Sequence, residues 1–190
     1  SFELTEFGGM QHVLVYRVFG KPKPSVGPPI DPIASENFSD LAMEYWRMKD
    51  FTSAIAVCKR AVEINPKAAR VYAYMGMSYK ERGDKEEALA AFRKAIEISP
   101  NDYMWNYTNV GELLAAKGEY DEAIKACRKA VEIDPRYSWG FTCIGNAYLS
   151  KGDYEAAIKE FQKAVELDPS DNRPKDGIQK AMAMKANPEV

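Results

Sequence analysis

Few residues of this sequence have the types and spacing that catalysis or metal binding requires. His12 is the single histidine, so two imidazoles cannot share a metal ion or a proton. The cysteines Cys58, Cys127 and Cys143 are too widely spaced to form a zinc-binding motif. The sequence contains neither a glycine-rich phosphate loop nor a nucleophile elbow. It therefore predicts no enzyme, no cofactor and no metal site.

Acidic residues recur singly at regular intervals. Glu63, Glu97, Glu132 and Glu166 each stand three residues before a proline. General acid–base catalysis needs groups placed around one substrate, and isolated acids at regular spacing do not provide that. We interpret these four residues as parts of a repeated structural element.

The cysteines predict buried, inert thiols. An odd number without close spacing argues against a disulfide framework. Cys58 and Cys127 fall on apolar helical stripes, where a free cysteine behaves as a small hydrophobic residue. From this we predict a reducing compartment and a cytoplasmic location.

Composition excludes several further classes of protein. The chain is 46% hydrophobic and 28% charged, which is typical of a globular protein and too apolar for a disordered one. Its formal net charge is −2 and it lacks a basic stripe, so we predict no nucleic-acid partner. No apolar run approaches the roughly 20 residues that span a bilayer. Because the chain starts with Ser1, we expect residues 1–9, ahead of Met10, to be a remnant of cloning.

Four similar four-residue motifs, each ending in proline, divide most of the sequence into repeats. The prolines are Pro66, Pro100, Pro135 and Pro169, which lie 34, 35 and 34 residues apart. The extra residue falls in the connection 101–104, where an insertion is tolerated. Because proline cannot continue a helix interior, each one marks the end of a repeat.

The repeats also share large, small and aromatic residues at fixed positions. The second has Tyr72, Gly76, Tyr79, Ala88 and Phe92, and the fourth has Phe141, Gly145, Tyr148, Ala157 and Phe161. The third repeat differs from this pattern in having Leu114 in place of tyrosine and Cys127 in place of phenylalanine. The first differs in having Ala42 in place of glycine and Cys58 in place of phenylalanine. Over residues 35–169 this pattern resembles the tetratricopeptide repeat (TPR) family. The resemblance implies an all-α fold, a right-handed α-solenoid of helix-turn-helix repeats, that binds other polypeptides.

Apolar residues at three- and four-residue steps independently predict helices. Helices are expected at 35–48, 51–64, 69–82, 85–98, 104–117, 120–132, 138–151 and 154–166. Between paired helices, Gly83, Gly118 and Gly152 suit a helix end, whereas Lys49 makes the first hinge less favourable. Asp84 and Glu87 predict a capping box. Across each pair we expect Gly76, Gly111 and Gly145 to face Ala88, Ala123 and Ala157.

A ninth helix at about 173–185 is predicted to cap the array. Its Ile178, Ala181 and Met182 would cover the apolar side of the last repeat, and its lysines would face water. The chain is thus expected to comprise a tail at 1–34, four repeats at 35–171, and a capping helix and tail at 172–190.

The tail before the array does not follow the repeat. Residues 11–19 predict a strand that is apolar on both faces, and residues 21–29 predict an extended Pro-rich linker. On one interpretation this tail lies along the array, either its own or a neighbour's. On the other it packs on the first repeat or pairs with a second copy.

The first helix of each repeat is predicted to line a concave face. Aromatic residues and methionines are favoured in binding surfaces, and side chains opposite the packing stripe would be accessible there. Asn109 and Asn146 would orient a peptide backbone. Alternatively, Trp105 and Trp139 fill gaps between adjacent first helices. The predicted peptide-binding residues are Met43, Tyr74, Met77, Trp105, Thr108, Asn109, Trp139, Thr142 and Asn146.

Some members of the family bind chaperone C-termini through a Lys/Asn/Asn/Lys/Arg carboxylate clamp. In one register the clamp positions hold Ser39, Met43, Tyr74, Trp105 and Asn109, and in the next they hold Ala73, Met77, Asn109, Trp139 and Cys143. Neither set contains lysine or arginine, so a chaperone tail is not the expected ligand. An apolar or mixed segment suits these side chains better.

We therefore predict a scaffold or adaptor that binds another polypeptide. Its own N-terminal tail or a second copy are the other candidate partners. Two alternative functions remain at this stage. One is homo-oligomeric assembly through the tail or the end helices, and the other is a targeting domain of a larger enzyme.

Overall fold

Helices make up almost all of the structure. This computed structural model describes residues 34–186, with side chains from residue 38 onward. Helix bounds agree with the prediction to within one residue, and no strand occurs in the described range. The predicted strand and linker, like His12, lie outside it. In chain order the helices are α2 (Ala34–Arg47), α3 (Phe51–Ile64), α4 (Ala69–Arg82), α5 (Lys85–Ile98), α6 (Met104–Ala116), α7 (Tyr120–Ile133), α8 (Ser138–Lys151), α9 (Tyr154–Leu167) and α10 (Arg173–Ala186).

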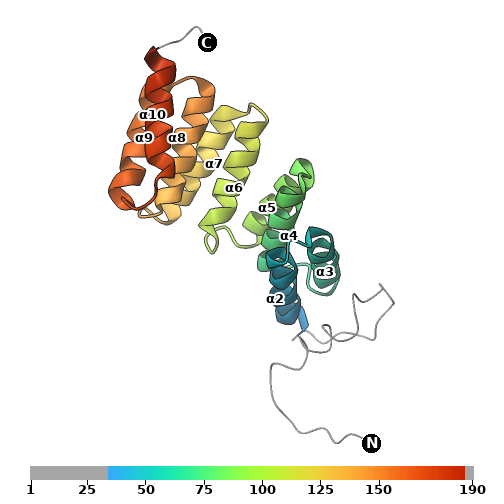
Figure 1. The fold of residues 1–190 in the computed structure, drawn as a ribbon. Helices are drawn as coiled ribbons and strands as arrows, with labels where there is room; N and C mark the ends of the chain where they lie inside the picture. The colour runs from blue at the N-terminus through green and yellow to red at the C-terminus, as the bar shows by residue number, and fades with distance from the viewer. Residues whose placement is uncertain (1–33, 187–190) are drawn as a thin grey trace, which may run out of the picture. The chain divides into compact units, whose positions relative to one another are not determined.

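Consecutive helices pair as hairpins, one hairpin per repeat (Figure 1). The pairs are α2 with α3, α4 with α5, α6 with α7, and α8 with α9. The second helix of each hairpin also packs against the first helix of the next, and α10 packs against α9 in the same way. Each repeat therefore buries its apolar side partly within its own hairpin and partly against its neighbour, as the all-α solenoid prediction requires.

The hinge inside each hairpin needs one residue with a left-handed backbone. Gly83, Gly118 and Gly152 take it, with φ of 95°, 83° and 88°. In the first hinge Lys49 takes the same position with φ of 58°. The amide of Asp50 then donates to the carbonyl of Tyr45 at 2.9 Å, the same bond that follows each glycine. The first hinge therefore keeps the geometry of the others without the residue that favours it.

The start of each second helix is capped less uniformly than the sequence predicts. Asp50 and Asp153 accept from the amides of Ser53 and Ala156 at 3.2 and 3.1 Å, as N-caps do. The capping box predicted at Asp84 is wrong, because its side chain makes no capping bond. Arg82 donates to that carboxylate instead.

Three of the four repeats close through a turn that explains the residue before the proline. The side chains of Asn65, Asp134 and Asp168 each accept a hydrogen bond from the amide two residues on, at 2.9–3.0 Å. Such a side chain stabilises a tight turn directly after a helix end. The proline between the two bonded residues then prevents the helix from continuing.

The close approach inside each hairpin involves an aromatic ring. A Cβ added to Gly76 would lie 2.8 Å from Phe92, and one added to Gly145 would lie 2.6 Å from Phe161. These rings, and not Ala88 or Ala157, supply the nearest atoms. In these two repeats the glycine leaves room for a ring from the second helix. At Gly111 the carbonyl oxygen of Ala123 lies 3.1 Å from the added Cβ, so the predicted approach to alanine is seen in that repeat.

At Gly111 the neighbouring group is a disulfide. Cys127 on α7 and Cys143 on α8 are bonded, with their Cα atoms 5.8 Å apart. Our expectation of three free thiols is thus wrong for this pair, because sequence separation did not show that the two helices bring them together. The reducing compartment that we inferred from free thiols loses that support. Cys58 is free and buried, and burial raises the pKa of its thiol to about 12.

Helix α10 caps the last repeat as predicted, but Met184 packs there in place of the expected Met182. Ala181 is fully buried, and Ile178 and Met184 pack against the apolar cluster of the fourth repeat. Met182, which we expected to cover that side, is 53% exposed. A small residue is again needed, because a Cβ on Gly177 would lie 2.6 Å from Phe161.

The joint between the second and third repeats is less regular. First helices of neighbouring repeats contact each other in the pairs α2–α4 and α6–α8, whereas α4 and α6 share no comparable contact among the described residues. Lys80 on α4 instead donates to Asn109 Oδ1 at 2.7 Å and pairs with Glu112. Asn106 is fully buried there, and its amide atoms find no partner in residues 34–186. At this joint, which follows the one-residue insertion, the side chains of Lys80, Asn109 and Glu112 connect α4 to α6 in place of direct helix packing.

Replacing Lys49 with glycine should stabilise the array. Removing the strain of a left-handed lysine outweighs the extra freedom that glycine has in the unfolded chain, so we expect a gain of about 0.5–1 kcal/mol in the free energy of unfolding. Urea denaturation followed by circular dichroism measures it. Lys59→Gly, inside α3, is the matched control and should cost about 1 kcal/mol. Equal losses of unfolding free energy for the two variants would contradict the conclusion that Lys49 is strained by its left-handed backbone.

Gly145→Ala should destabilise the fourth repeat, although alanine normally favours a helix. The added methyl meets the Phe161 ring, and overpacking of this kind costs about 1–3 kcal/mol. The first repeat carries alanine and cysteine at these two positions, Ala42 and Cys58. The double variant Gly145→Ala, Phe161→Cys should therefore lose less than the sum of its single changes in urea denaturation. Additive losses would show that the two positions do not share this space.

Candidate peptide-binding face

The predicted binding residues that remain accessible form what we call the first-helix face. Tyr74, Met77, Trp105 and Trp139 are half-buried, as is Met43, while Asn146 is exposed. They come from four first helices, where repeat after repeat places equivalent residues on the same side. The first-helix face consists of Met43, Tyr74, Met77, Trp105, Asn109, Trp139 and Asn146.

Thr108 and Thr142 do not belong to this accessible surface. Thr108 is fully buried and Thr142 is 1% exposed. Their hydroxyls donate to the carbonyls of Trp105 at 3.0 Å and Ser138 at 3.2 Å. Tyr137 also hydrogen-bonds Thr108, and burial raises the pKa of this tyrosine. Both hydroxyl groups bond within their own helices, and both buried threonines present nothing to a partner.

Trp105 is both a packing residue and a surface residue. Its ring meets Phe92 edge-on, with centroids 6.4 Å apart, and meets Tyr103 at 5.9 Å. These contacts join α6 to the preceding second helix, α5, and to the residue just before α6. The ring nevertheless stays half-exposed. Such edge-to-face contacts hold the indole in one orientation.

Trp139 is held by a cation. The guanidinium carbon of Arg173, from the start of α10, lies 4.1 Å from the centroid of its ring. Asp171 accepts two hydrogen bonds from Arg173, at 2.9 and 2.8 Å, and this pairing raises the pKa of the arginine. A planar guanidinium that is fixed over an indole stabilises its position. The capping helix thus also organises this part of the first-helix face.

Asn109 is less available for hydrogen bonding to a peptide than the sequence suggested. Its side-chain nitrogen donates to the carbonyl of Trp105 at 2.8 Å, and its oxygen accepts from Lys80 at 2.7 Å. Glu112 neutralises the same lysine. A peptide would have to displace one of these bonds to use Asn109, whereas Asn146 is exposed.

At the other end of the face, Tyr74 is positioned by an arginine. Arg70 lies 5.4 Å from the centroid of its ring and donates from Nε to its hydroxyl at 3.2 Å, which raises the pKa of Arg70. Asp40 on α2 pairs with the same arginine at 3.4 Å. Both groups are exposed, so this pair contributes little to stability.

Sequence reasoning missed the charges that hold the face in place. Arg173 occupies, in the register of the repeats, the position of Trp139, and Lys80 lies one helical turn beyond Met77. Extending the repeat register into the capping helix would have identified Arg173. The bridge from Lys80 to Glu112 depends on the irregular joint, which the sequence indicated only as an inserted residue.

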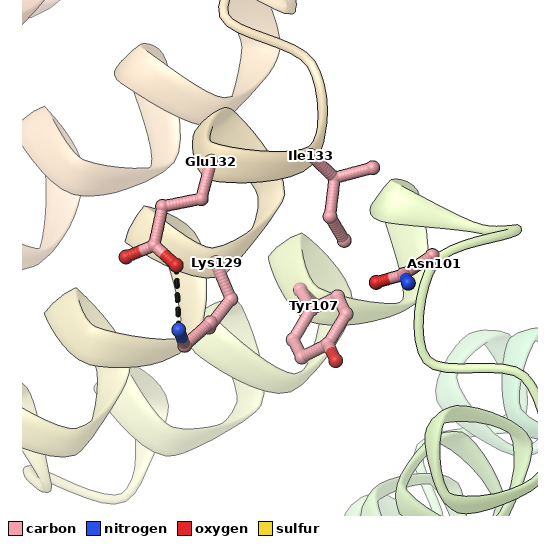
Figure 2. Close-up of a pocket in the computed structure, with 5 residues that line it drawn as sticks. All are labelled: Asn101, Tyr107, Lys129, Glu132 and Ile133. Atoms are coloured by element: carbon pink, nitrogen blue, oxygen red, sulfur yellow. Dashed lines mark hydrogen bonds and ion pairs between the residues drawn. The ribbon is translucent and has the colours of Figure 1, made fainter.

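A separate pocket of about 500 Å³ lies on the third repeat (Figure 2). It is lined by Asn101, Tyr107, Lys129, Glu132 and Ile133. Lys129 pairs with Glu132 at 2.5 Å, which raises the pKa of this lysine. The same kind of pair recurs as Arg60 with Glu63 and Lys94 with Glu97. The ion pair is thus a feature of the repeat, and the pocket shares no residue with the first-helix face.

Between residues 34 and 186 no group of His, Cys, Asp and Glu is arranged to hold a metal ion. Within the same limits no helix is long and apolar enough to cross a bilayer. The functional question therefore concerns the first-helix face.

Solved structures with the same fold are numerous. The chain is 21% identical to the MamA protein over 80% of this chain and 82% of that one, with a TM-score of 0.71. It is 19% identical to pilF of Pseudomonas aeruginosa over 80% and 69%, with a TM-score of 0.72. The first TPR of Spaghetti (RPAP3), bound to the HSP90 peptide SRMEEVD, is 22% identical over 63% and 94%, with a TM-score of 0.59. At these identities the likeness shows the fold alone.

Family models match the same repeats that the prolines delimit. Models described as tetratricopeptide repeat match residues 36–68 and 69–102, and one described as TPR repeat matches 111–152 and 145–173. No curated protein sequence matches the chain significantly. The matched segments fall on all four hairpins, leave out residues 103–110 at the start of α6, and reach the first residue of α10. The chain belongs to the tetratricopeptide repeat family.

Proposed function

We propose that the array is a non-enzymatic scaffold that binds an extended, largely apolar peptide segment along the first-helix face. The observation that carries this proposal is the pair Trp105 and Trp139. They stand at equivalent positions on neighbouring first helices and remain half-exposed. Large aromatic side chains bury much area on binding and dominate the energy of many interfaces.

The two indoles are held before any partner arrives. Phe92 and Tyr103 support Trp105, and Arg173 covers Trp139. A preorganised side chain loses little conformational entropy on binding, so more of the burial energy is available for affinity. Met77 and Tyr74 extend the apolar surface toward α2.

The charges near the face favour an apolar or mixed segment over an acidic tail. Arg70, Lys80 and Arg173 are each paired with a carboxylate of the chain, namely Asp40, Glu112 and Asp171. A cation that is already paired offers less attraction to a ligand carboxylate. The solved relative binds an HSP90 peptide. In this chain the clamp positions of either register carry no cation, so we propose a different class of segment.

The other functions predicted from the sequence stay predictions. The tail that would occupy the face or mediate assembly lies outside the described residues. Deleting residues 10–30 and measuring light scattering against concentration separates the cases. A change in mass would favour assembly, and tighter peptide binding by an unchanged monomer would favour self-occupancy. A cytoplasmic location likewise stays a prediction.

Replacing Trp105 and Trp139 with alanine should weaken peptide binding. The test begins with peptides selected on the wild-type array from a random library, and their affinity is then measured by fluorescence polarisation. We expect roughly tenfold weaker binding for each tryptophan, because each truncation removes a buried aromatic contact.

Tyr120→Ala is the matched control, because Tyr120 is a half-buried aromatic residue on a second helix. It should leave peptide affinity unchanged. Thermal melts of all variants show whether the array remains folded, which matters most for Trp105 because of its packing role. Selected peptides that bind the folded Trp139→Ala variant as tightly as wild type would overturn the proposed site.

A further inference from the structure

The disulfide between Cys127 and Cys143 occupies the place of an aromatic ring. In the fourth repeat Phe161 lies between Gly145 on its own first helix and Gly177 on the next one, and a Cβ on either glycine would meet the ring at 2.6 Å. In the third repeat Cys127 stands where Phe161 stands, and Cys143 stands where Gly177 stands. A Cβ on Gly111 would meet the sulfur of Cys127 at 2.3 Å and that of Cys143 at 3.0 Å. Two sulfurs here fill the space of one ring.

This substitution is specific to one joint of the array. Cys58 occupies the position of Cys127 in the first repeat, but the residue that follows on the next first helix is Tyr74. Cys58 is accordingly free and fully buried. The chain thus contains its own comparison, the same cysteine position with and without a partner.

We propose that the Cys127–Cys143 disulfide is a reversible, redox-controlled link that locks the fourth repeat onto the third. The bond joins α7 to α8 across the connection between the two repeats, and it closes a separation of 16 residues. Both sulfurs also lie against Gly111 of α6, where a Cβ would meet them. One covalent bond therefore holds three helices that meet at a joint, whereas the ring of Phe161 holds its three helices by packing alone.

The reduced state also has a place in the structure. The sulfur of Cys143 lies 3.6 Å from the carbonyl oxygen of Thr108, so a thiol there finds an acceptor on α6. Without the bond, however, two thiols must share the space of a disulfide beside Gly111. We expect α8 to move away from α6 and α7 by the small distance that separates bonded from non-bonded sulfurs, and the joint to loosen.

The chemistry is thiol–disulfide exchange with a small disulfide such as oxidised glutathione. The thiolate of one cysteine attacks the oxidant and releases one of its thiols. The second cysteine then attacks the mixed disulfide, forming the Cys127–Cys143 bond and releasing the second thiol. A dithiol reductant reverses both steps and becomes a cyclic disulfide. Because Cys127 is fully buried and Cys143 is 2% exposed, exchange requires local opening of the joint.

The link would regulate the first-helix face, a consequence that rests on the proposed function. Trp105 lies on α6, whose Gly111 faces the two sulfurs, and Trp139 lies on α8, which carries Cys143. Selected peptides should therefore bind more weakly to the reduced protein. The state of the bond is measured independently of any peptide, so a failure of peptide binding leaves the redox test intact.

The test equilibrates the full chain in glutathione buffers of increasing oxidised fraction, then denatures it in acid and alkylates it. Mass spectrometry should find one alkylated cysteine, Cys58, in the oxidised protein and all three in the reduced protein. The melting temperature of the oxidised form should be about 5–10 °C higher, as expected for a loop of this length. Hydrogen exchange should show that the loss of protection in the reduced form concentrates in α8.

Two variants make the result decisive. Cys58→Ala should keep the full difference between the oxidised and reduced melting temperatures. The double variant Cys127→Phe, Cys143→Gly copies the arrangement of Phe161 and Gly177, so it should fold and melt at one temperature in both buffers. Cys143→Ala provides a second redox-insensitive form. Three alkylated cysteines in the most oxidising buffer, or equal melting temperatures of the wild type in both states, would overturn the proposal.

Discussion

The close approach of a first-helix glycine to a bulky group from the second helix is the contact on which the array depends. At Gly76 and Gly145 that group is the ring of Phe92 or Phe161, with no room for even a methyl group. A fully buried ring against bare backbone fixes how far apart the two helices can lie. Because each second helix also packs on the following first helix, the same ring can set the spacing to the next repeat, as Phe161 does against Gly177. Stacking is thus a consequence of one contact used repeatedly.

The accessible surface follows from this packing. Once one side of each first helix is buried, the opposite side must carry whatever the array shows to a partner, and here it carries two tryptophans, a tyrosine and methionines. The nearby cations are neutralised by carboxylates of the chain itself, so the face is apolar with fixed polar edges. These features suit the recognition of another polypeptide.

The array is least uniform at its joints. Between the second and third repeats, one inserted residue is accompanied by a lysine bridge from Lys80 and by a fully buried Asn106 whose amide atoms have no partner in the described part of the chain. Between the third and fourth repeats a covalent bond replaces a ring. Differences in function along a repeat array are most easily introduced at such joints, because the hairpins on either side keep their own cores.

The sequence by itself determined the helices, their bounds and the repeat. Periodic apolar residues, hinge glycines and closing prolines act within one or two turns of chain, so their effect can be read without knowing what lies opposite. It also placed Trp105 and Trp139 where both side chains stay partly exposed, although Thr108 and Thr142, predicted on the same side, are buried. Only the tertiary structure decided which side chains meet across helices: Phe92 rather than Ala88 at Gly76, Cys143 at Cys127, Arg173 at Trp139, and the burial of Thr108 and Thr142. Those contacts depend on the distance and orientation of one helix relative to another, and helical periodicity specifies the face of a residue but not its partner.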